Sequence, residues 1–188
     1  LPPRLGVQDL GRTMIAGKSM DAIVREYRPE DLEGVLDLVR EMEAELAEKF
    51  PDVKIESGIK SYRERYLKPG RKYKTFVALT ENKVVGFLMG YPSLGAPEVD
   101  QMYDILPLSP GWTPPEFYLQ ITFVSIPFRR RGISKKLHTE AVAYARSRGF
   151  KEVYACIAKW NESEIQVIRS LKFDLKDLGY RYRLTLKF

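Results

Sequence analysis

Apolar residues along the chain recur at two different spacings, which predict helices and strands in alternation. From residue 32 to residue 46 they fall three or four positions apart, as on one face of a helix. A short β-prone segment at 22–27 precedes this helix, and Arg28-Pro29-Glu30-Asp31 supplies a turn suited to a helix start. A weaker repeat of the same kind over residues 59–66 predicts a second, shorter helix.

The middle of the chain shows strand-like patterns. Residues 73–79 and 83–91 are rich in Val, Phe and Leu, and the turn-forming triplet Thr80-Glu81-Asn82 separates them, so we predict a β-hairpin. Residues 117–126 are almost continuously apolar or β-branched, which is typical of a central strand covered on both faces.

The C-terminal third continues the alternation. Helical spacing from residue 133 to residue 147 ends near Gly149, a residue type favoured just after a helix. A strand at 151–158, a short helix at 165–171 and a closing strand at 180–188 follow. This order predicts one α/β domain, of the mixed α+β type, spanning residues 22–188.

Two segments fit neither pattern. Residues 1–21 lack a helical or strand period, and we interpret them as an N-terminal arm or a leader. Residues 91–116 hold many prolines and predict a long insertion. Its prolines are Pro92, Pro97, Pro107, Pro110, Pro114 and Pro115.

Composition narrows the function classes. With 188 residues, 44% of them hydrophobic, the chain is long enough to bury a core. One cysteine, Cys156, and one histidine, His138, cannot form an internal disulfide or a Cys/His metal cluster, so we expect no metal and a reducing cytoplasm. No apolar run is long enough to cross a membrane. We interpret Cys156 as a buried strand residue and His138 as a structural or surface residue.

The distribution of charge singles out one helix start. The net charge is +6, yet no Lys or Arg lies between Lys83 and Arg129. Positive side chains then crowd a position where the helix dipole disfavours them. A bound polyvalent anion, best a pyrophosphate, would explain the crowding, and the alternative is a solvated basic turn. The cations are Arg129, Arg130, Arg131, Lys135 and Lys136.

The same segment resembles the acetyl-CoA signature of the Gcn5-related N-acetyltransferase (GNAT) superfamily. That signature reads Gln/Arg-x-x-Gly-x-Gly/Ala after a β-strand, and here Arg129-x-x-Gly132-x-Ser134 follows one. Asn161 before the last helix resembles a later block of the family, in which Lys172 replaces a usual glycine. The order of predicted elements agrees as well. The protein N-terminal and ribosomal-protein branch of the family is the most similar.

The resemblance implies a fold, a co-substrate and a binding site. The fold is a mixed, mostly antiparallel sheet of about seven strands flanked by about four helices. Acetyl-CoA is the co-substrate, and no metal is involved. Asn161 would contact the coenzyme, or else serve only as a helix N-cap. The implied coenzyme-binding residues are Thr122, Phe123, Val124, Arg129, Arg130, Arg131, Gly132, Ile133, Ser134, Lys135 and Asn161.

Catalytic residues are harder to place, because Ile168 stands where many family members carry a tyrosine that protonates the departing thiolate. Glu116, Tyr118, Gln120 and Thr122 alternate along one strand face, and some relatives carry a catalytic Glu or Tyr nearby. Tyr118, then Glu116, are our candidates. The alternatives are a packed aromatic ring for Tyr118 and a strand-edge charge for Glu116.

The expected reaction is direct attack of a primary amine on the thioester. The amine could be a protein N-terminus, a lysine or a small metabolite, and the protein could act as a homodimer. Glu98, Asp100 and Asp104 in the insertion are hypothesised to attract the protonated amine, the alternative being a solvated insertion. Two rival functions are a non-catalytic acyl-CoA sensor and a nucleic-acid-binding module in which Phe128 stacks on a base. Of these, we do not expect the nucleic-acid module.

Overall fold

The computed structural model describes residues 21–94 and 115–188. The described part contains a sheet of seven strands in the order β1-β2-β3-β4-β5-β7-β6. Neighbouring strands pair antiparallel, except that β4 and β5 pair parallel. The expected domain start at residue 22 lies close to the first described residue. Residues 1–20 of the predicted arm (1–21) and residues 95–114 of the predicted insertion (91–116) lie outside the described residues. The strands are β1 (Ile23–Glu26), β2 (Lys74–Thr80), β3 (Lys83–Ser93), β4 (Glu116–Val124), β5 (Glu152–Ala158), β6 (Asp174–Asp177) and β7 (Arg181–Lys187).

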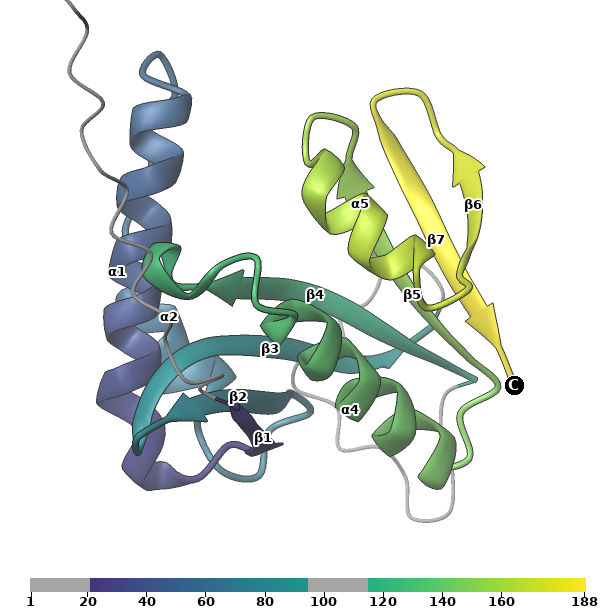
Figure 1. Ribbon diagram of the computed structural model, residues 1–188, viewed down its shortest axis with the longest axis horizontal. Coiled ribbons are helices and arrows are strands. Elements are labelled where there is room, and N and C mark those ends of the chain that lie inside the picture. Colours follow the sequence, from purple (N-terminus) through teal and green to yellow (C-terminus); the bar gives the residue numbers. More distant parts are fainter. Residues whose placement is uncertain (1–20, 95–114) are drawn as a thin grey trace, which may run out of the picture.

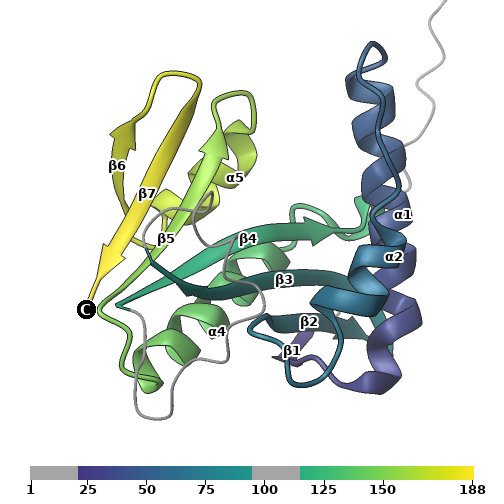
Figure 2. The same ribbon diagram turned by 180° about the vertical axis from the view of Figure 1, so that it is seen from behind.

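The helices cover both faces of the sheet (Figures 1 and 2). On one face α4 and α5 bury their apolar residues, and on the other face α1 and the segment after α2 do the same. This arrangement is the mixed, mostly antiparallel sheet with about four flanking helices that the family resemblance implies. The helices are α1 (Leu32–Lys49), α2 (Ile59–Ser61), which continues as a wider π-type turn (Tyr62–Tyr66), α4 (Ile133–Ser147) and α5 (Glu162–Arg169).

Helix α1 follows β1 through a 3-10 turn (Pro29–Asp31) that is fixed by ionic hydrogen bonds. Asp31 is only 4% exposed, and both of its carboxylate oxygens accept from the Arg25 guanidinium at 2.7 and 2.9 Å. The Arg28 backbone N–H donates to the same carboxylate at 2.8 Å.

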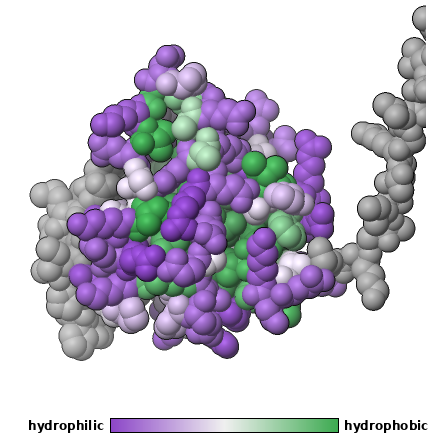
Figure 3. Space-filling model, turned by 90° about the vertical axis from the view of Figure 1, so that its left-hand side faces the viewer, coloured by the Kyte–Doolittle hydropathy of each residue, from purple (hydrophilic) through white to green (hydrophobic). Residues whose placement is uncertain are grey.

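Figure 3 shows the face of the molecule on the α1 side, where most side chains are hydrophilic and hydrophobic ones lie between them.

The predicted β2–β3 hairpin is present, but its turn has two residues instead of the predicted triplet, because Thr80 belongs to β2. Thr80 pairs with Lys83, and both connecting residues, Glu81 and Asn82, have positive φ angles. A turn with both central residues in this conformation matches the natural twist of the flanking strands.

Strand β4 is less regular than the sequence suggests. Its pairing with β3 shifts register between Met89 and Gly90, which face Ile121 and Leu119, so Gln120 is an extra residue on β4. A bulge of this kind redirects the side chains that follow it. The expectation that residues 116, 118, 120 and 122 share one face is therefore wrong.

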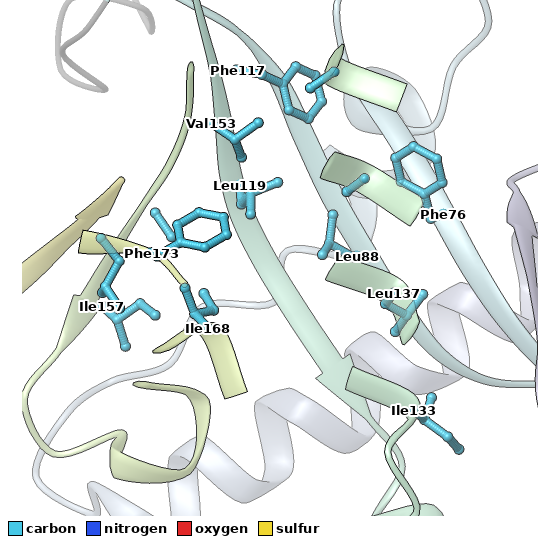
Figure 4. Close-up of a cluster of buried hydrophobic side chains, with 14 of the residues drawn as sticks. Phe76, Leu88, Phe117, Leu119, Ile133, Leu137, Val153, Ile157, Ile168 and Phe173 are labelled. Atoms are coloured by element: carbon cyan, nitrogen blue, oxygen red, sulfur yellow. The ribbon is translucent and has the colours of Figure 1, made fainter. Parts of the chain in front are cut away.

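The main core lies between the sheet and helices α4 and α5. Figure 4 shows Phe76, Leu88 and Leu137 close to helix α4, and Ile157, Ile168 and Phe173 grouped around α5. Ile168 is 1% exposed, which makes it a core residue of the α5 half. Strand β6 has no counterpart among the segments identified from the apolar pattern, because all four of its residues are exposed.

Candidate active site

The central sheet splits between its two parallel strands. β4 and β5 pair from Glu116 and Glu152 as far as Leu119 and Ala155, and beyond these residues the strands diverge (Figure 1). The gap contains a cleft of about 670 Å³, lined by both strands, the start of α4, helix α5 and the C-terminal half of α1. Ten of the eleven predicted coenzyme-binding residues line this cleft, among them Thr122, Phe123, Val124 and Asn161, and the exception is Arg131.

The α4 helix starts in a conformation suited to an anion. Arg130 has φ +60° and Gly132 has φ +74°, so two left-handed residues turn the chain into the helix. The first intrahelical hydrogen bond runs from the Lys136 N–H to the Gly132 carbonyl at 3.0 Å. The N–H groups of Ile133, Ser134 and Lys135 come before that bond and are free for a ligand. A Cβ at Gly132 would meet no atom within 4 Å, so the space beside this turn is open.

Two of the five cations predicted to surround the anion have internal partners instead. Arg129 Nη1 donates to Glu45 Oε1 on α1 at 2.9 Å, and Nη2 bonds to the second oxygen of the same carboxylate. Its Nε donates to the Val124 carbonyl at 2.9 Å. Lys136 points toward β1, where it lies 3.5 Å from the Asp21 carboxylate. The hydrogen bonds from Arg129 hold the pKa of the Glu45 carboxyl below its ordinary value.

The other three cations stay closer to the turn. Arg130 and Lys135 are exposed and line the cleft. Arg131 is exposed outside the cleft lining, where it donates to the Pro127 carbonyl at 3.1 Å and lies over the Phe128 ring. The positive charge at the helix start is therefore smaller than the sequence suggests.

The wide end of the cleft is bridged by aromatic contacts. Phe50, just after α1, meets Trp160 edge-on with ring centroids 5.3 Å apart, and the Lys49 ammonium lies 4.1 Å from the Trp160 ring centroid. Asn161 is the N-cap residue of α5, but its side chain makes no capping hydrogen bond. Its Oδ1 accepts instead from the Ser163 hydroxyl at 3.3 Å.

His138 is buried beside the site, which agrees with the structural alternative and not with a surface position. It is 1% exposed, lines the cleft, and lies between β4, α4 and α5. Its Nδ1 is 2.9 Å from the Ser134 carbonyl, and its Nε2 is 3.3 Å from Thr122 Oγ1 and 3.2 Å from Glu164 Oε1. Ser134 donates its hydroxyl to the other oxygen of Glu164 at 3.1 Å. The sequence offered no signal for Glu164, because its partners are distant along the chain.

Near the narrow end, the cleft is lined by residues that sequence analysis did not select. Gln120, the extra residue of the bulge, has a side-chain oxygen that is buried and has no hydrogen-bond partner in the described structure. Cys156 is half-buried, lines the cleft and packs against a tyrosine cluster, whereas the sequence predicted a buried residue.

The two catalytic candidates lie outside the cleft lining. Tyr118 is buried in a cluster with Tyr91 and Tyr154, stacked on Tyr154 with ring centroids 4.8 Å apart. Glu116, at the start of β4, accepts a hydrogen bond from Arg183 at 2.8 Å. The structure thus gives Glu116 an ion-pair partner on β7 and packs Tyr118 beside the point where the strands separate.

A sequence model describing the acetyltransferase (GNAT) family matches residues 38–173, which include β4, the α4 turn and α5. The chain belongs to the GNAT acetyltransferase family. The family model describes acetyltransferases, so acetyl transfer is the general activity of the family to which the chain belongs. No curated protein matches the chain.

Solved structures support the GNAT fold. The PaiA N-acetyltransferase of Thermoplasma acidophilum, solved in complex with coenzyme A, has a TM-score of 0.64 and 16% identity, with 90% of this chain and 100% of that one covered. The GNAT domain of S. lividans PAT gives 0.68 and 16%, with 89% and 90% covered. YncA of Salmonella typhimurium, solved with acetyl-CoA, gives 0.60 and 15%, with 89% and 94% covered.

Two further properties hold for the described residues. No helix in residues 21–94 and 115–188 is long and apolar enough to span a membrane. The same residues contain no group of three or more His, Cys, Asp or Glu side chains arranged to hold a metal ion.

Proposed function

We propose that this GNAT protein transfers an acetyl group from acetyl-CoA to a primary amine without a covalent enzyme intermediate. The observation that carries the proposal is the cleft between β4 and β5, which ends at a helix start with free N–H groups. An elongated ligand with a diphosphate at one end matches this combination of a long cleft and an anion site.

The residues present fit the coenzyme. The free N–H groups of Ile133, Ser134 and Lys135 would bind the diphosphate, with Gly132 allowing close approach. Arg130, Arg131 and Lys135 would add charge. Backbone groups of Thr122, Phe123 and Val124 would bind the pantetheine arm, and Asn161 would lie near it. Glu45 compensates the charge of Arg129, so this residue would add less to the attraction than the other cations.

Acetyl-CoA supplies an activated acyl carbon attached to a good leaving group. The amine nitrogen attacks that carbon, the C–N bond forms, the C–S bond breaks, the nitrogen loses a proton and the thiolate leaves. Ile168 cannot protonate the sulfur. A thiolate with a pKa near that of cysteine, about 8.5, can leave without an acid beside it. Tyr118 stays our candidate for proton transfer because it lies one residue before the strands separate.

The narrow end of the cleft, where β4 and β5 separate, also has a hydrogen-bonding group suited to an amine acceptor. The buried Gln120 side-chain oxygen has no donor in the described structure. A buried acceptor without a partner is costly, so a ligand N–H is the group expected to satisfy it. We infer that Gln120 receives an N–H of the incoming amine.

The acceptor could be a protein N-terminus, a lysine or a small amine, and we favour the protein N-terminal and ribosomal-protein branch on the resemblance of Pro-Phe-Arg-Arg-Arg-Gly at residues 127–132. The acidic residues Glu98, Asp100 and Asp104, proposed to attract the amine, lie outside the described residues. We also propose that the protein forms a homodimer.

The test combines ligand binding with transfer. Purified protein is incubated with acetyl-CoA and a mixture of peptides and small amines, and mass spectrometry searches for a product heavier by one acetyl group. We expect acetyl-CoA to raise the melting temperature and at least one amine to gain an acetyl group. Inorganic phosphate at the same concentration serves as the control ligand.

Other outcomes identify the rival functions. Tight coenzyme binding without any acetylated product would favour an acyl-CoA sensor. Binding of RNA or DNA that falls steeply with salt and does not compete with coenzyme A would favour a nucleic-acid module. Either outcome would contradict the proposed transferase.

A further inference from the structure

A buried ionisable pair lies inside the proposed coenzyme cleft and has no part in the reaction described above. Glu164 in the first turn of α5 approaches His138 in the second turn of α4, with Oε1 and Nε2 3.2 Å apart. The His138 side chain is 1% exposed and that of Glu164 is 18% exposed. Both residues line the cleft.

The carboxylate of Glu164 lies next to the anion site. Its Oε2 accepts from the Ser134 hydroxyl at 3.1 Å, and the backbone N–H of Ser134 is one of the three free donors of the α4 turn. The family signature has Gly or Ala at this position, and neither residue could make such a bond. A bare carboxylate here would repel a diphosphate bound at the same turn.

The hydrogen-bond partners of His138 change with its proton. Nδ1 faces the Ser134 carbonyl at 2.9 Å, which only accepts, so this nitrogen carries hydrogen in either state. In the neutral ring Nε2 is an acceptor and pairs with the Thr122 hydroxyl at 3.3 Å. In the imidazolium Nε2 is a donor and pairs with Glu164. One proton therefore decides whether the charge of Glu164 is compensated.

The other residues around the His138 ring do not carry a charge that could substitute for His138 or Glu164. Strands β2 and β3 present apolar residues to α4, including Phe76, Val85 and Leu88. Thr122 on β4 is neutral, and Glu164 is the charged residue that contacts the ring from α5. The remaining charged residues that line the cleft are Glu45, Lys49, Arg129, Arg130 and Lys135.

We propose that His138 and Glu164 are positioning residues that set the charge of the coenzyme site. With the ring protonated, the pair is neutral and the α4 turn accepts the diphosphate. With the ring neutral, the uncompensated Glu164 carboxylate opposes the diphosphate and weakens coenzyme binding. This inference rests on the proposed function, since it assumes that coenzyme A binds at the α4 turn.

The experiment measures acetyl-CoA affinity by calorimetry between pH 5.5 and pH 8.5 for the wild type, His138→Asn, Glu164→Gln and the double variant. At the acidic end we expect His138→Asn to bind about tenfold more weakly than the wild type, a typical coupling between charged sites. The double variant should regain wild-type affinity, because no bare carboxylate is left. At the alkaline end Glu164→Gln should bind about tenfold more tightly than the wild type.

Controls separate charge from structure. The 3′-phosphate of the coenzyme also titrates in this pH range. Its effect on affinity is the same for every variant. Repeating the measurement with dephospho-coenzyme A, which lacks this phosphate, removes that effect. Thermal unfolding of each variant reports folding. A structural role alone would lower the affinity of His138→Asn equally at every pH, with no recovery in the double variant.

The inference is overturned if Glu164→Gln and the wild type bind equally at pH 8.5, or if the double variant binds as weakly as His138→Asn. Glu164→Gln keeps the shape of the side chain and serves as the test if His138→Asn does not fold. A wild type that binds no coenzyme at any pH would instead contradict the proposed function itself.

Discussion

At the scale of single residues, the sequence located the turn before α4 but not the partners of its side chains. Gly132 and the free N–H groups follow from the local pattern of a strand, a glycine and a helix. Arg129 and Lys136 belong to the same cluster of charge, yet they pair with Glu45 and Asp21. These partners are far away in the sequence, so no local pattern could reveal them. The contacts of His138 with Thr122 and Glu164 could not be predicted for the same reason.

Replacing Glu45 tests whether Arg129 serves the coenzyme site through its charge or by fixing the turn before α4. In Glu45→Gln the guanidinium loses its ionic partner, and the cleft loses one negative charge. Because the pair is more than a third exposed on the Arg129 side, we expect a loss of stability below about 1 kcal/mol. The freed cation should strengthen acetyl-CoA binding several-fold, measured by calorimetry at low and high salt.

Glu41→Gln is the matched control for this variant. Glu41 lies one turn earlier on α1, accepts hydrogen bonds from Ser125 and the Ile126 N–H, and acts on Arg129 through a smaller Coulomb attraction than Glu45 does. Its replacement should change coenzyme affinity and its salt dependence much less than Glu45→Gln does. Weaker coenzyme binding in Glu45→Gln would mean that the ion pair prepares the turn for the ligand.

Tyr118→Phe tests the proposed proton-transfer residue. The variant keeps the aromatic packing against Tyr91 and Tyr154 and removes only the hydroxyl. We expect kcat to fall about 100-fold, a typical contribution of an acid–base group, with unchanged coenzyme affinity. Unchanged kcat and an unchanged pH profile would leave Tyr118 as a packing residue.

At the scale of elements, apolar spacing predicted most of the fold. Helix α1, the β2–β3 hairpin, β4, α4 with its end near Gly149, β5, α5 and β7 lie close to their predicted positions. Strand β6 was missed because an exposed edge strand has no apolar face to produce a pattern. The bulge in β4 was missed because it depends on register with β3, which one sequence does not specify.

Gly90→Ala tests whether the bulge needs close contact between β3 and β4. A Cβ at Gly90 would lie 2.6 Å from the Tyr118 carbonyl oxygen and 2.7 Å from the Phe117 ring. We expect a loss of about 2–3 kcal/mol in the free energy of unfolding, because neither neighbour can move freely. Urea denaturation measures the loss.

Gly58→Ala provides the comparison for Gly90→Ala. Its φ angle is −82°, and an added Cβ would lie no closer than 3.4 Å to a neighbouring atom. It should change stability by less than about 1 kcal/mol. Equal effects of the two substitutions would show that β3 and β4 do not depend on the small residue at position 90.

At the scale of the whole molecule, two groups of strands pair with each other along the first residues of β4 and β5, and the cleft is the space between their diverging ends. The two sides are also bridged by Phe50 with Trp160 and by Ser134 with Glu164. The sequence could indicate this arrangement only through its resemblance to a family, since the separation of two strands leaves no local signal.

The stability of the whole molecule should depend on pH through Asp31, which joins β1 to α1. Burial acts to raise the pKa of Asp31, but hydrogen bonds from Arg25 and from the Arg28 N–H outweigh it and hold the pKa below its ordinary value. The stabilisation is then fully present above the unfolded carboxyl pKa of about 3.9 and is lost as pH falls through the lower folded value.

Asp31→Asn should therefore lower the free energy of unfolding by about 2 kcal/mol at pH 7, the range for hydrogen bonds to charged groups. The difference from the wild type should shrink as the pH falls below about 4, since the wild type then loses the same charge. Urea unfolding at several pH values measures it. A difference that stays constant down to pH 2.5 would contradict the role assigned to the ionised carboxylate.

The central claim is that the α4 turn binds the diphosphate of coenzyme A, and calorimetry with two matched ligands tests it most directly. Acetyl-CoA carries the diphosphate, whereas S-acetyl-pantetheine carries the same thioester and arm without it. We predict saturable binding of acetyl-CoA and at least about 100-fold weaker binding of S-acetyl-pantetheine, the loss expected when several charge-assisted hydrogen bonds are absent. Equal affinity for the two ligands would contradict the account.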